Sequence, residues 1–157
     1  MNFLPLVLVF LSMFVVQPTP SVAPPTIVEA QIVEVEIVDQ RVENLNQFFR
    51  RYKCPQPYRS EQYVQVADKY DLPYELLPVL SLKESTCGKR VFRPNNYWGY
   101  GSVRFLSVEE GMNFVADKLA NGNYYKGKTL DQKLRTYNSV NKDYPSHTKS
   151  LMQSIDN

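Results

Sequence analysis

The segment that decides the fold runs from residue 76 to residue 88 and reads LLPVLSLKESTCG. Apolar side chains fall on nearly every side of its first seven residues, which predicts a helix buried at the centre of a small domain. Leu77, Leu80 and Glu84 share one stripe at helical spacing, so Glu84 continues a buried face. A carboxyl group at the edge of an apolar core is readily protonated, because desolvation disfavours its ionised form. This pattern favours a general acid for sugar chemistry.

The turn that follows is rich in aromatic side chains and glycine, and reads NNYWGYG over residues 95–101. No helical period runs from Ser85 to Leu106, which predicts an irregular loop or a small hairpin lobe. Trp98 stands between small and polar neighbours, and an aromatic face offers an apolar surface to a pyranose ring. We therefore expect Trp98 to be a sugar platform, with core packing as the alternative.

The rest of the folded part has the apolar spacing of amphipathic helices. Helices are predicted from about Asp39 to Tyr52 and from Ser60 to Tyr70. Two capping boxes, at residues 107–110 and 129–132, open further helices. A last short helix is expected from Ser146 to Ile155. The fold class predicted is therefore mainly α, with one irregular or hairpin lobe.

Residues 67–89, which include Asp71-Leu72-Pro73 and Glu84-Ser85, resemble the entry and catalytic helices of the lysozyme-like superfamily. The set Glu-Ser-x-x-Gly-Lys, followed by Asn96-x-Trp98-Gly99, is similar to bacterial N-acetylglucosaminidase-like domains that cut peptidoglycan. Tyr124-Tyr125 and Tyr137-Asn138 resemble later helices of these domains and of lytic transglycosylases, where a Tyr-Asn pair borders the sugar cleft. The residues at 99–102, Gly-Tyr-Gly-Ser, depart from the Gly-Leu-Met-Gln run common in lytic transglycosylases.

The resemblance implies that Glu84 is the catalytic acid and that no cofactor or metal takes part. It implies a groove for peptidoglycan or a related amino-sugar polymer. The substrate-binding residues expected in that groove are Ser85, Asn96, Trp98, Tyr100, Tyr137 and Asn138. For Tyr137 the spacing from Leu134 and Leu130 leaves core packing as an equal alternative.

No second carboxylate presents itself in the lobe that follows Glu84, because residues 86–108 contain no Asp or Glu. Glu109, Glu110 and Asp131 lie in first turns of helices, where capping and the helix dipole account for them. This favours a lytic-transglycosylase mechanism with one acid over hydrolysis by an N-acetylglucosaminidase, which normally needs two carboxylates. The alternative from another class is a cell-wall glycan-binding module without turnover.

The first 38 residues have a composition unlike that of the rest. Residues 1–16 are mostly apolar and too short to span a bilayer comfortably, so a signal peptide or a membrane anchor is predicted. Residues 17–38, Pro-rich and then acidic, are predicted to be a linker or stalk, and residues 39–157 the lysozyme-like catalytic domain. We therefore expect an exported protein: secreted, periplasmic or at the cell surface, and held to the membrane if the segment is not cleaved.

The charge balance and the few histidine and cysteine residues narrow the possible functions further. Residues 50–157 hold 17 of the 18 Lys and Arg residues and 11 of the 16 Asp and Glu residues, a positive balance that suits an anionic polymer. The aromatic residues form no RNA-binding signature, so nucleic acid is not expected as a partner, and a monomer is expected. One histidine and two cysteines at no ligand spacing favour no metal site. In an exported protein Cys54 and Cys87 either form one disulfide or remain small apolar residues.

Overall fold

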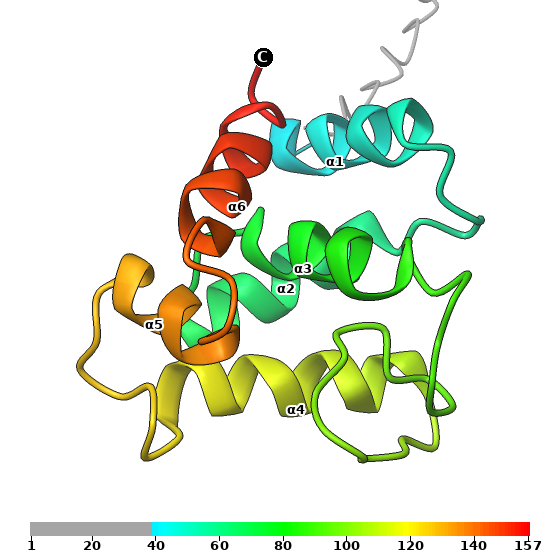
Figure 1. Cartoon of the computed structure of the whole chain (residues 1–157). Coiled ribbons are helices and arrows are strands. Elements are labelled where there is room, and N and C mark those ends of the chain that lie inside the picture. Colours follow the sequence, from blue (N-terminus) through cyan, green and yellow to red (C-terminus); the bar gives the residue numbers. More distant parts are fainter. Residues whose placement is uncertain (1–38) are drawn as a thin grey trace, which may run out of the picture. The chain divides into compact units, whose positions relative to one another are not determined.

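Six helices form the regular structure of residues 39–157, the part of the chain that the computed structural model describes (Figure 1). They are α1 (Gln40–Arg51), α2 (Ser60–Tyr70), α3 (Leu76–Ser85), α4 (Val108–Asn121), α5 (Leu130–Tyr137) and α6 (Tyr144–Gln153). This range contains no β-strand, so the prediction of a mainly helical fold is confirmed. Residues 86–107 form an irregular lobe, and the hairpin alternative for them is wrong.

The predicted signal peptide or anchor at residues 1–16 and the predicted stalk at residues 17–38 lie outside the described residues. Within residues 39–157, no helix combines the length and the apolar character that crossing a bilayer requires.

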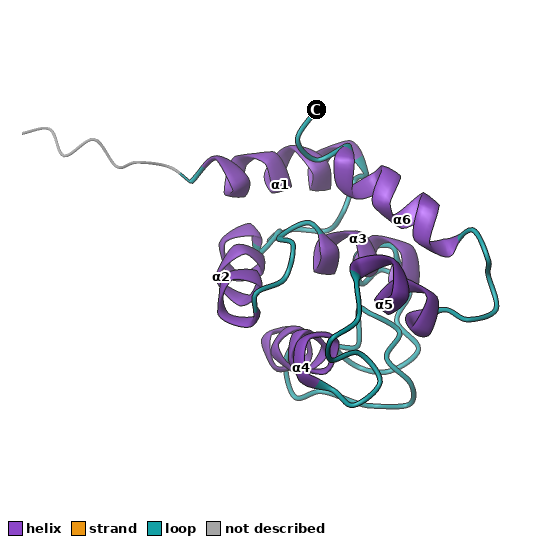
Figure 2. Cartoon of the chain, turned by 90° about the vertical axis from the view of Figure 1, so that its left-hand side faces the viewer, coloured by secondary structure: helices purple, strands orange, loops and turns teal. Residues whose placement is uncertain are grey.

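Helix α3 lies at the centre, with α2 and α6 packed against it and α1 and α4 on opposite sides (Figures 1 and 2). All six of its first residues, Leu76 to Ser81, are buried. A helix with apolar residues all round can be stable in water only when other elements cover every side of it. The sequence therefore predicts correctly that this segment is central.

Side-chain caps explain where three of the six helices of residues 39–157 begin. The Asp39 side chain accepts the amide of Arg41 at the start of α1, and Ser107 accepts the amide of Glu110 at the start of α4. Thr129 and Gln132 form the full capping box predicted for α5. Helix α6 begins at Tyr144 rather than at Ser146, because Pro145 is well suited to a first helical turn.

The irregular lobe is attached to the helices through Trp98, whose side chain is 0% exposed. The indole Nε1 donates a hydrogen bond to the carbonyl of Leu77 in α3, at 3.0 Å. On the other side, Gly111 of α4 makes room for it, since a Cβ at position 111 would lie 3.0 Å from the indole ring. Trp98 therefore connects the lobe to α3 and α4 at once.

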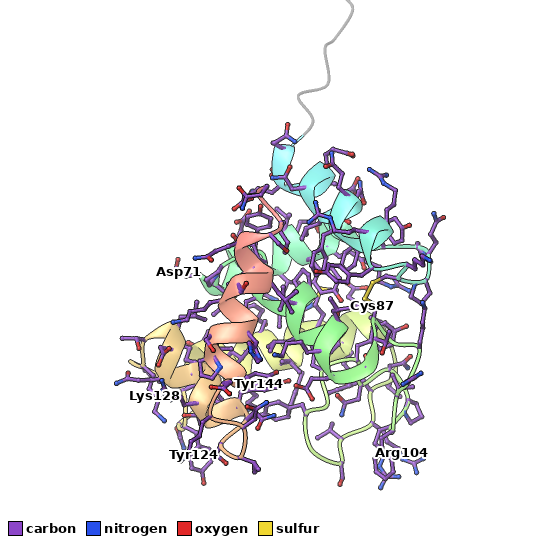
Figure 3. The ribbon with its side chains drawn as sticks, turned by 45° about the horizontal axis from the view of Figure 1, so that its top comes forward. Asp71, Cys87, Arg104, Tyr124, Lys128 and Tyr144 are labelled. Carbon is purple, nitrogen blue, oxygen red and sulfur yellow. A yellow bond between two sulfur atoms is a disulfide. The ribbon has the colours of Figure 1, made fainter. Side chains whose placement is uncertain are left out.

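A disulfide between Cys54 and Cys87 joins the segment after α1 to the turn after α3 (Figure 3). It closes a loop across a sequence separation of 33 residues that includes α2 and all of α3. Cross-linking a loop of this size stabilises the fold mainly by restricting the unfolded chain.

We predict that replacing both cysteines, Cys54→Ala with Cys87→Ala, lowers the free energy of unfolding by about 2–4 kcal/mol. Urea denaturation of the oxidised wild type and of the double variant measures the difference. Dithiothreitol should bring the wild type to the level of the variant and leave the variant unchanged. Equal stability of the two oxidised proteins would contradict the prediction.

Candidate active site

Glu84 lies in the last turn of α3, where the buried helix reaches the surface. Its side chain is half-buried, and the chain turns sharply after it through left-handed backbone at Thr86 and Cys87. The apolar sequence of α3 keeps this helix in the core, so its carboxyl end carries Glu84 to the boundary between core and solvent. A general acid needs such a position, in which the group is partly desolvated yet accessible.

One oxygen of Glu84 is held by a tyrosine from the far end of the chain. The hydroxyl of Tyr144, at the start of α6, donates to Glu84 Oε1 at 2.5 Å (Figure 3). Burial, together with the hydrogen bond to the Glu84 carboxylate, raises the pKa of Tyr144 well above its ordinary value. Tyr144 therefore remains a hydrogen-bond donor throughout the pH range in which carboxyl groups titrate.

Lys83 places a cation close to this pair. Lys83 Nζ lies 4.1 Å from the ring centroid of Tyr144, on the face of the ring. Desolvation lowers the pKa of Lys83, and the neighbouring charge of Glu84 opposes that shift. The ammonium group contributes a positive charge beside the carboxylate without forming an ion pair with it.

The second oxygen of Glu84 lies beneath Gly99 of the irregular lobe. A side chain at position 99 would place its Cβ 3.0 Å from Glu84 Oε2 and 3.2 Å from Glu84 Cβ. Gly99 also has a φ of +61°, in the left-handed region that favours glycine. Glycine is therefore required here both by the backbone and by the carboxylate below it.

Gly99 is exposed and forms one wall of a hollow of about 210 Å³, which we call the proximal hollow. Its other lining residues are aromatic, apart from one more glycine: Tyr100, Gly101, Tyr125 and Tyr137. The ring of Tyr137 stacks on that of Tyr144, with centroids 6.2 Å apart, and its hydroxyl donates to the carbonyl of Trp98. The carboxylate thus lies next to an aromatic hollow that is open to solvent.

Four of the six predicted groove residues do not line the proximal hollow, and three of these four are buried. Trp98 is completely buried, so its ring has no free face for a sugar, and the core alternative is the one that holds. Ser85 and Asn96 are each 3% exposed, and backbone groups occupy their polar atoms. The expectation that these three residues contact substrate is wrong, because the lobe uses them to fold onto α3.

Ser85 and Asn96 instead shape the turn that carries Gly99. The Ser85 hydroxyl donates to the carbonyl of Tyr97 at 2.7 Å and accepts the amide of Gly88 at 2.8 Å. The Asn96 side chain accepts the amide of Tyr100 and donates to the carbonyl of Val103. Both residues therefore act on the site through the backbone of the lobe.

Tyr100 and Tyr137 line the proximal hollow, and their contact with a sugar stays a prediction. Asn138 ends α5, and its side-chain carbonyl accepts the amide of Asn141, so it shapes the turn after α5. Sequence reasoning missed Tyr144 altogether. No spacing rule links Tyr144 to Glu84, which is 60 residues earlier, so only the packing of α6 against α3 could reveal the pair.

Two of the other acids named from the sequence have partners away from Glu84. Glu110 accepts the amide of Leu106, and Asp131 pairs with Arg135 and Lys149. Glu84 is the one carboxylate of residues 39–157 that contributes to the raised pKa of both Tyr137 and Tyr144. No group of three or more His, Cys, Asp or Glu in that range could hold a metal ion.

No protein-family model, curated protein or solved structure matches this chain, so the lysozyme-like resemblance remains a prediction.

We predict that Gly99→Ala lowers any activity of Glu84 by roughly 100-fold, because the new methyl group displaces the carboxylate. Gly127→Ala is the matched control: its φ is +74°, yet a Cβ there would meet nothing within 4 Å. Both variants should lose similar stability from backbone strain, about 1–2 kcal/mol. Thermal unfolding and turnover, measured on both proteins, separate strain from displacement. An equal activity in the two variants would contradict the role of Gly99.

We also predict that Tyr144→Phe reduces turnover by about tenfold to 100-fold, since a hydrogen bond to a charged group contributes about 1.5–3 kcal/mol. The ring and its packing stay, so the fold should be kept. Tyr58→Phe serves as control, because Tyr58 packs on Phe49 and touches none of the site. The kcat of each variant is measured on the same substrate and compared with that of the wild type. A kcat unchanged in Tyr144→Phe would show that Glu84 needs no such support.

Proposed function

We propose that this chain cleaves the β-1,4 glycan strand of peptidoglycan, with Glu84 as its acid, on a lysozyme-like helical domain. The observation that carries the proposal is the setting of Glu84. One oxygen is held by the Tyr144 hydroxyl at 2.5 Å, and the other lies next to Gly99 at the aromatic proximal hollow. A carboxyl group with one oxygen anchored and the other close to a glycine that walls an open hollow suits proton transfer to a bound substrate.

The lining of the proximal hollow supports a sugar as the substrate. Tyr100, Tyr125 and Tyr137 give this hollow an aromatic lining, which suits the apolar face of a pyranose ring. Lys89, Arg90 and Arg104 are carried by the neighbouring lobe, which suits a polymer with carboxylate groups. Peptidoglycan combines both properties, because its amino sugars carry lactyl and peptide carboxylates.

The chemistry proposed needs one acid that acts twice. Protonated Glu84 gives its proton to the glycosidic oxygen, and the bond from that oxygen to the anomeric carbon breaks. The resulting Glu84 carboxylate then takes the proton of the 6-hydroxyl of the N-acetylmuramyl residue. The freed oxygen bonds to the anomeric carbon of its own ring, which yields a 1,6-anhydro end and regenerates protonated Glu84 without water.

The surroundings of Glu84 favour this route over hydrolysis. A hydrolase of this type places a second carboxylate within about 10 Å of the acid to activate water or to attack the sugar. Two of the three candidates named from the sequence are occupied, Glu110 with the Leu106 amide and Asp131 with Arg135 and Lys149, while Glu109 lies in the first turn of α4. An attack by the substrate's own hydroxyl removes the need for a second acid.

The test compares wild-type protein with Glu84→Gln on purified peptidoglycan, followed by mass spectrometry of the soluble products. We expect anhydro-muropeptides from the wild type and none from the variant, because glutamine has no proton to give to the leaving oxygen. Glutamine keeps the size of the side chain and can still accept the hydrogen bond from Tyr144, so binding of glycan should persist.

Each of the other possible results of this experiment would point to a different function or mechanism. Reducing ends in place of anhydro ends would establish hydrolysis and overturn the single-acid route. Lysis that persists in Glu84→Gln would exclude Glu84 as the acid. If neither protein releases products while both bind the glycan, the chain is a binding module and the proposed cleavage fails.

A further inference from the structure

The irregular lobe of residues 86–107 carries most of the exposed apolar side chains of the described chain. Five large apolar side chains are exposed in residues 39–157, and three of them, which we call the apolar patch, belong to the lobe: Val91, Phe92 and Leu106. Phe92 is 83% exposed and Leu106 is 95% exposed. Single exposed apolar residues are ordinary on protein surfaces, whereas a group of them on one loop indicates an interaction surface.

Hydrogen bonds join the two segments of the lobe that carry the apolar patch. The amide of Phe105 donates to the carbonyl of Pro94 at 3.2 Å, and the side-chain amide of Asn95 donates to the carbonyl of Phe105 at 2.9 Å. Residues 91–95 therefore run beside residues 104–106. The patch lines neither the proximal hollow nor the larger hollows beside α1, α4 and α6, so it is not the wall of a known cavity.

Four cations and no acid accompany the apolar patch in the lobe. The cations are Lys89, Arg90, Arg93 and Arg104. None of them forms an ion pair with another residue of the range 39–157. The guanidinium of Arg93 lies 4.6 Å from the ring centroid of Phe92, and its Nε is buried with no hydrogen-bond partner in that range. This positive charge is not neutralised within the described chain, so it attracts an anionic partner.

The position of the patch separates it from the candidate active site. Figure 3 shows Arg104 at the outer edge of the lobe, well apart from Tyr144, whose hydroxyl donates to Glu84. The lobe residues that wall the proximal hollow are Gly99, Tyr100 and Gly101, and none of them belongs to the patch. A partner on the patch therefore requires a function other than holding the substrate at Glu84.

We propose that the lobe docks on an anionic lipid bilayer. Phe92 and Leu106 enter the boundary between headgroups and acyl chains, and the arginines of the lobe bind lipid phosphates. Exposed apolar side chains flanked by cations are the features that bind proteins to the surface of such a bilayer. A hydrated glycan strand offers no apolar interior in which Phe92 and Leu106 could be buried. The inference goes beyond the proposed cleavage and does not depend on it.

The experiment places a fluorescent reporter in the patch of the full chain, by the substitution Phe92→Trp. Vesicles of phosphatidylcholine and phosphatidylglycerol in equal parts are then added. We expect the emission to shift to shorter wavelength and to be quenched by lipids brominated on their acyl chains, because the ring leaves water. Trp98 contributes a constant background, since it is 0% exposed.

Val140→Trp is the matched control for position. Val140 is 93% exposed and lies in the turn between α5 and α6, outside the lobe. Its variant should show neither the shift nor the quenching. Both variants contain residues 1–38, so any membrane binding by that segment is common to the two proteins and does not produce a difference between them.

A second comparison tests the charges. In the Phe92→Trp protein, Arg90→Gln with Arg104→Gln should raise the lipid concentration needed for half of the shift by about 30-fold. Lys126→Gln with Lys128→Gln removes the same charge from the segment before α5, and Figure 3 shows Lys128 far from Arg104. This control pair should leave the required lipid concentration unchanged. Vesicles of phosphatidylcholine alone should produce no shift.

Three results would overturn the docking. They are an unchanged emission of Phe92→Trp on anionic vesicles, an equal shift in Val140→Trp, and an equal response of the two charge variants. A shift with polyglutamate but not with anionic vesicles would assign the patch to an acidic protein instead of a bilayer. The experiment contains no peptidoglycan, so its failure leaves the proposed cleavage untouched, and a failure of the cleavage test leaves the docking untouched.

Discussion

The burial of Trp98 is the constraint on which the candidate site depends. An indole ring with no exposed surface, hydrogen-bonded to the Leu77 carbonyl, fixes the irregular lobe against the central helix. Gly99 follows it directly in the chain and is therefore placed over the Glu84 carboxylate. Burial of so large an aromatic ring contributes about 3 kcal/mol, and the hydrogen bonds of Ser85 and Asn96 add to it in holding residues 86–107, which have no regular secondary structure. Packing, rather than a ladder of backbone hydrogen bonds, gives the lobe its shape.

The electrostatics of Glu84 follow from the same arrangement. Helix α3 must be buried because it is apolar all round, and it therefore brings its terminal carboxylate to the edge of the core. Tyr144 then occupies one oxygen, and Lys83 adds a positive charge across the Tyr144 ring. Both neighbours favour a defined orientation of the carboxylate. Burial raises the pKa of Tyr137 and Tyr144, so their hydroxyls keep donating to the Trp98 carbonyl and to Glu84.

Most helices and the central place of α3 could be predicted, because capping residues and apolar spacing are local signals. Trp98 could not be assigned in the same way. Small and polar neighbours in the chain made it resemble an exposed platform, whereas Tyr63 and α3, its neighbours in space, bury it. Ser85 and Asn96 were misjudged for the same reason: their hydrogen-bond partners are backbone groups of the folded lobe. An aromatic residue in a loop packs or binds according to contacts that its local sequence does not encode.

What the sequence by itself determined is the mainly helical class, the buried helix with Glu84 in its last turn, and the lack of acids in the lobe that follows. These features depend on residue type and on spacing along the chain. Only the tertiary structure decided which residues surround Glu84, since Tyr144 is 60 residues away and reaches it through the packing of α6 on α3. It also decided that the ring of Trp98 packs in the core and that Tyr100 and Tyr125 each line two neighbouring hollows. Contacts between distant segments form when apolar surfaces are buried together, and no local pattern specifies which segments meet.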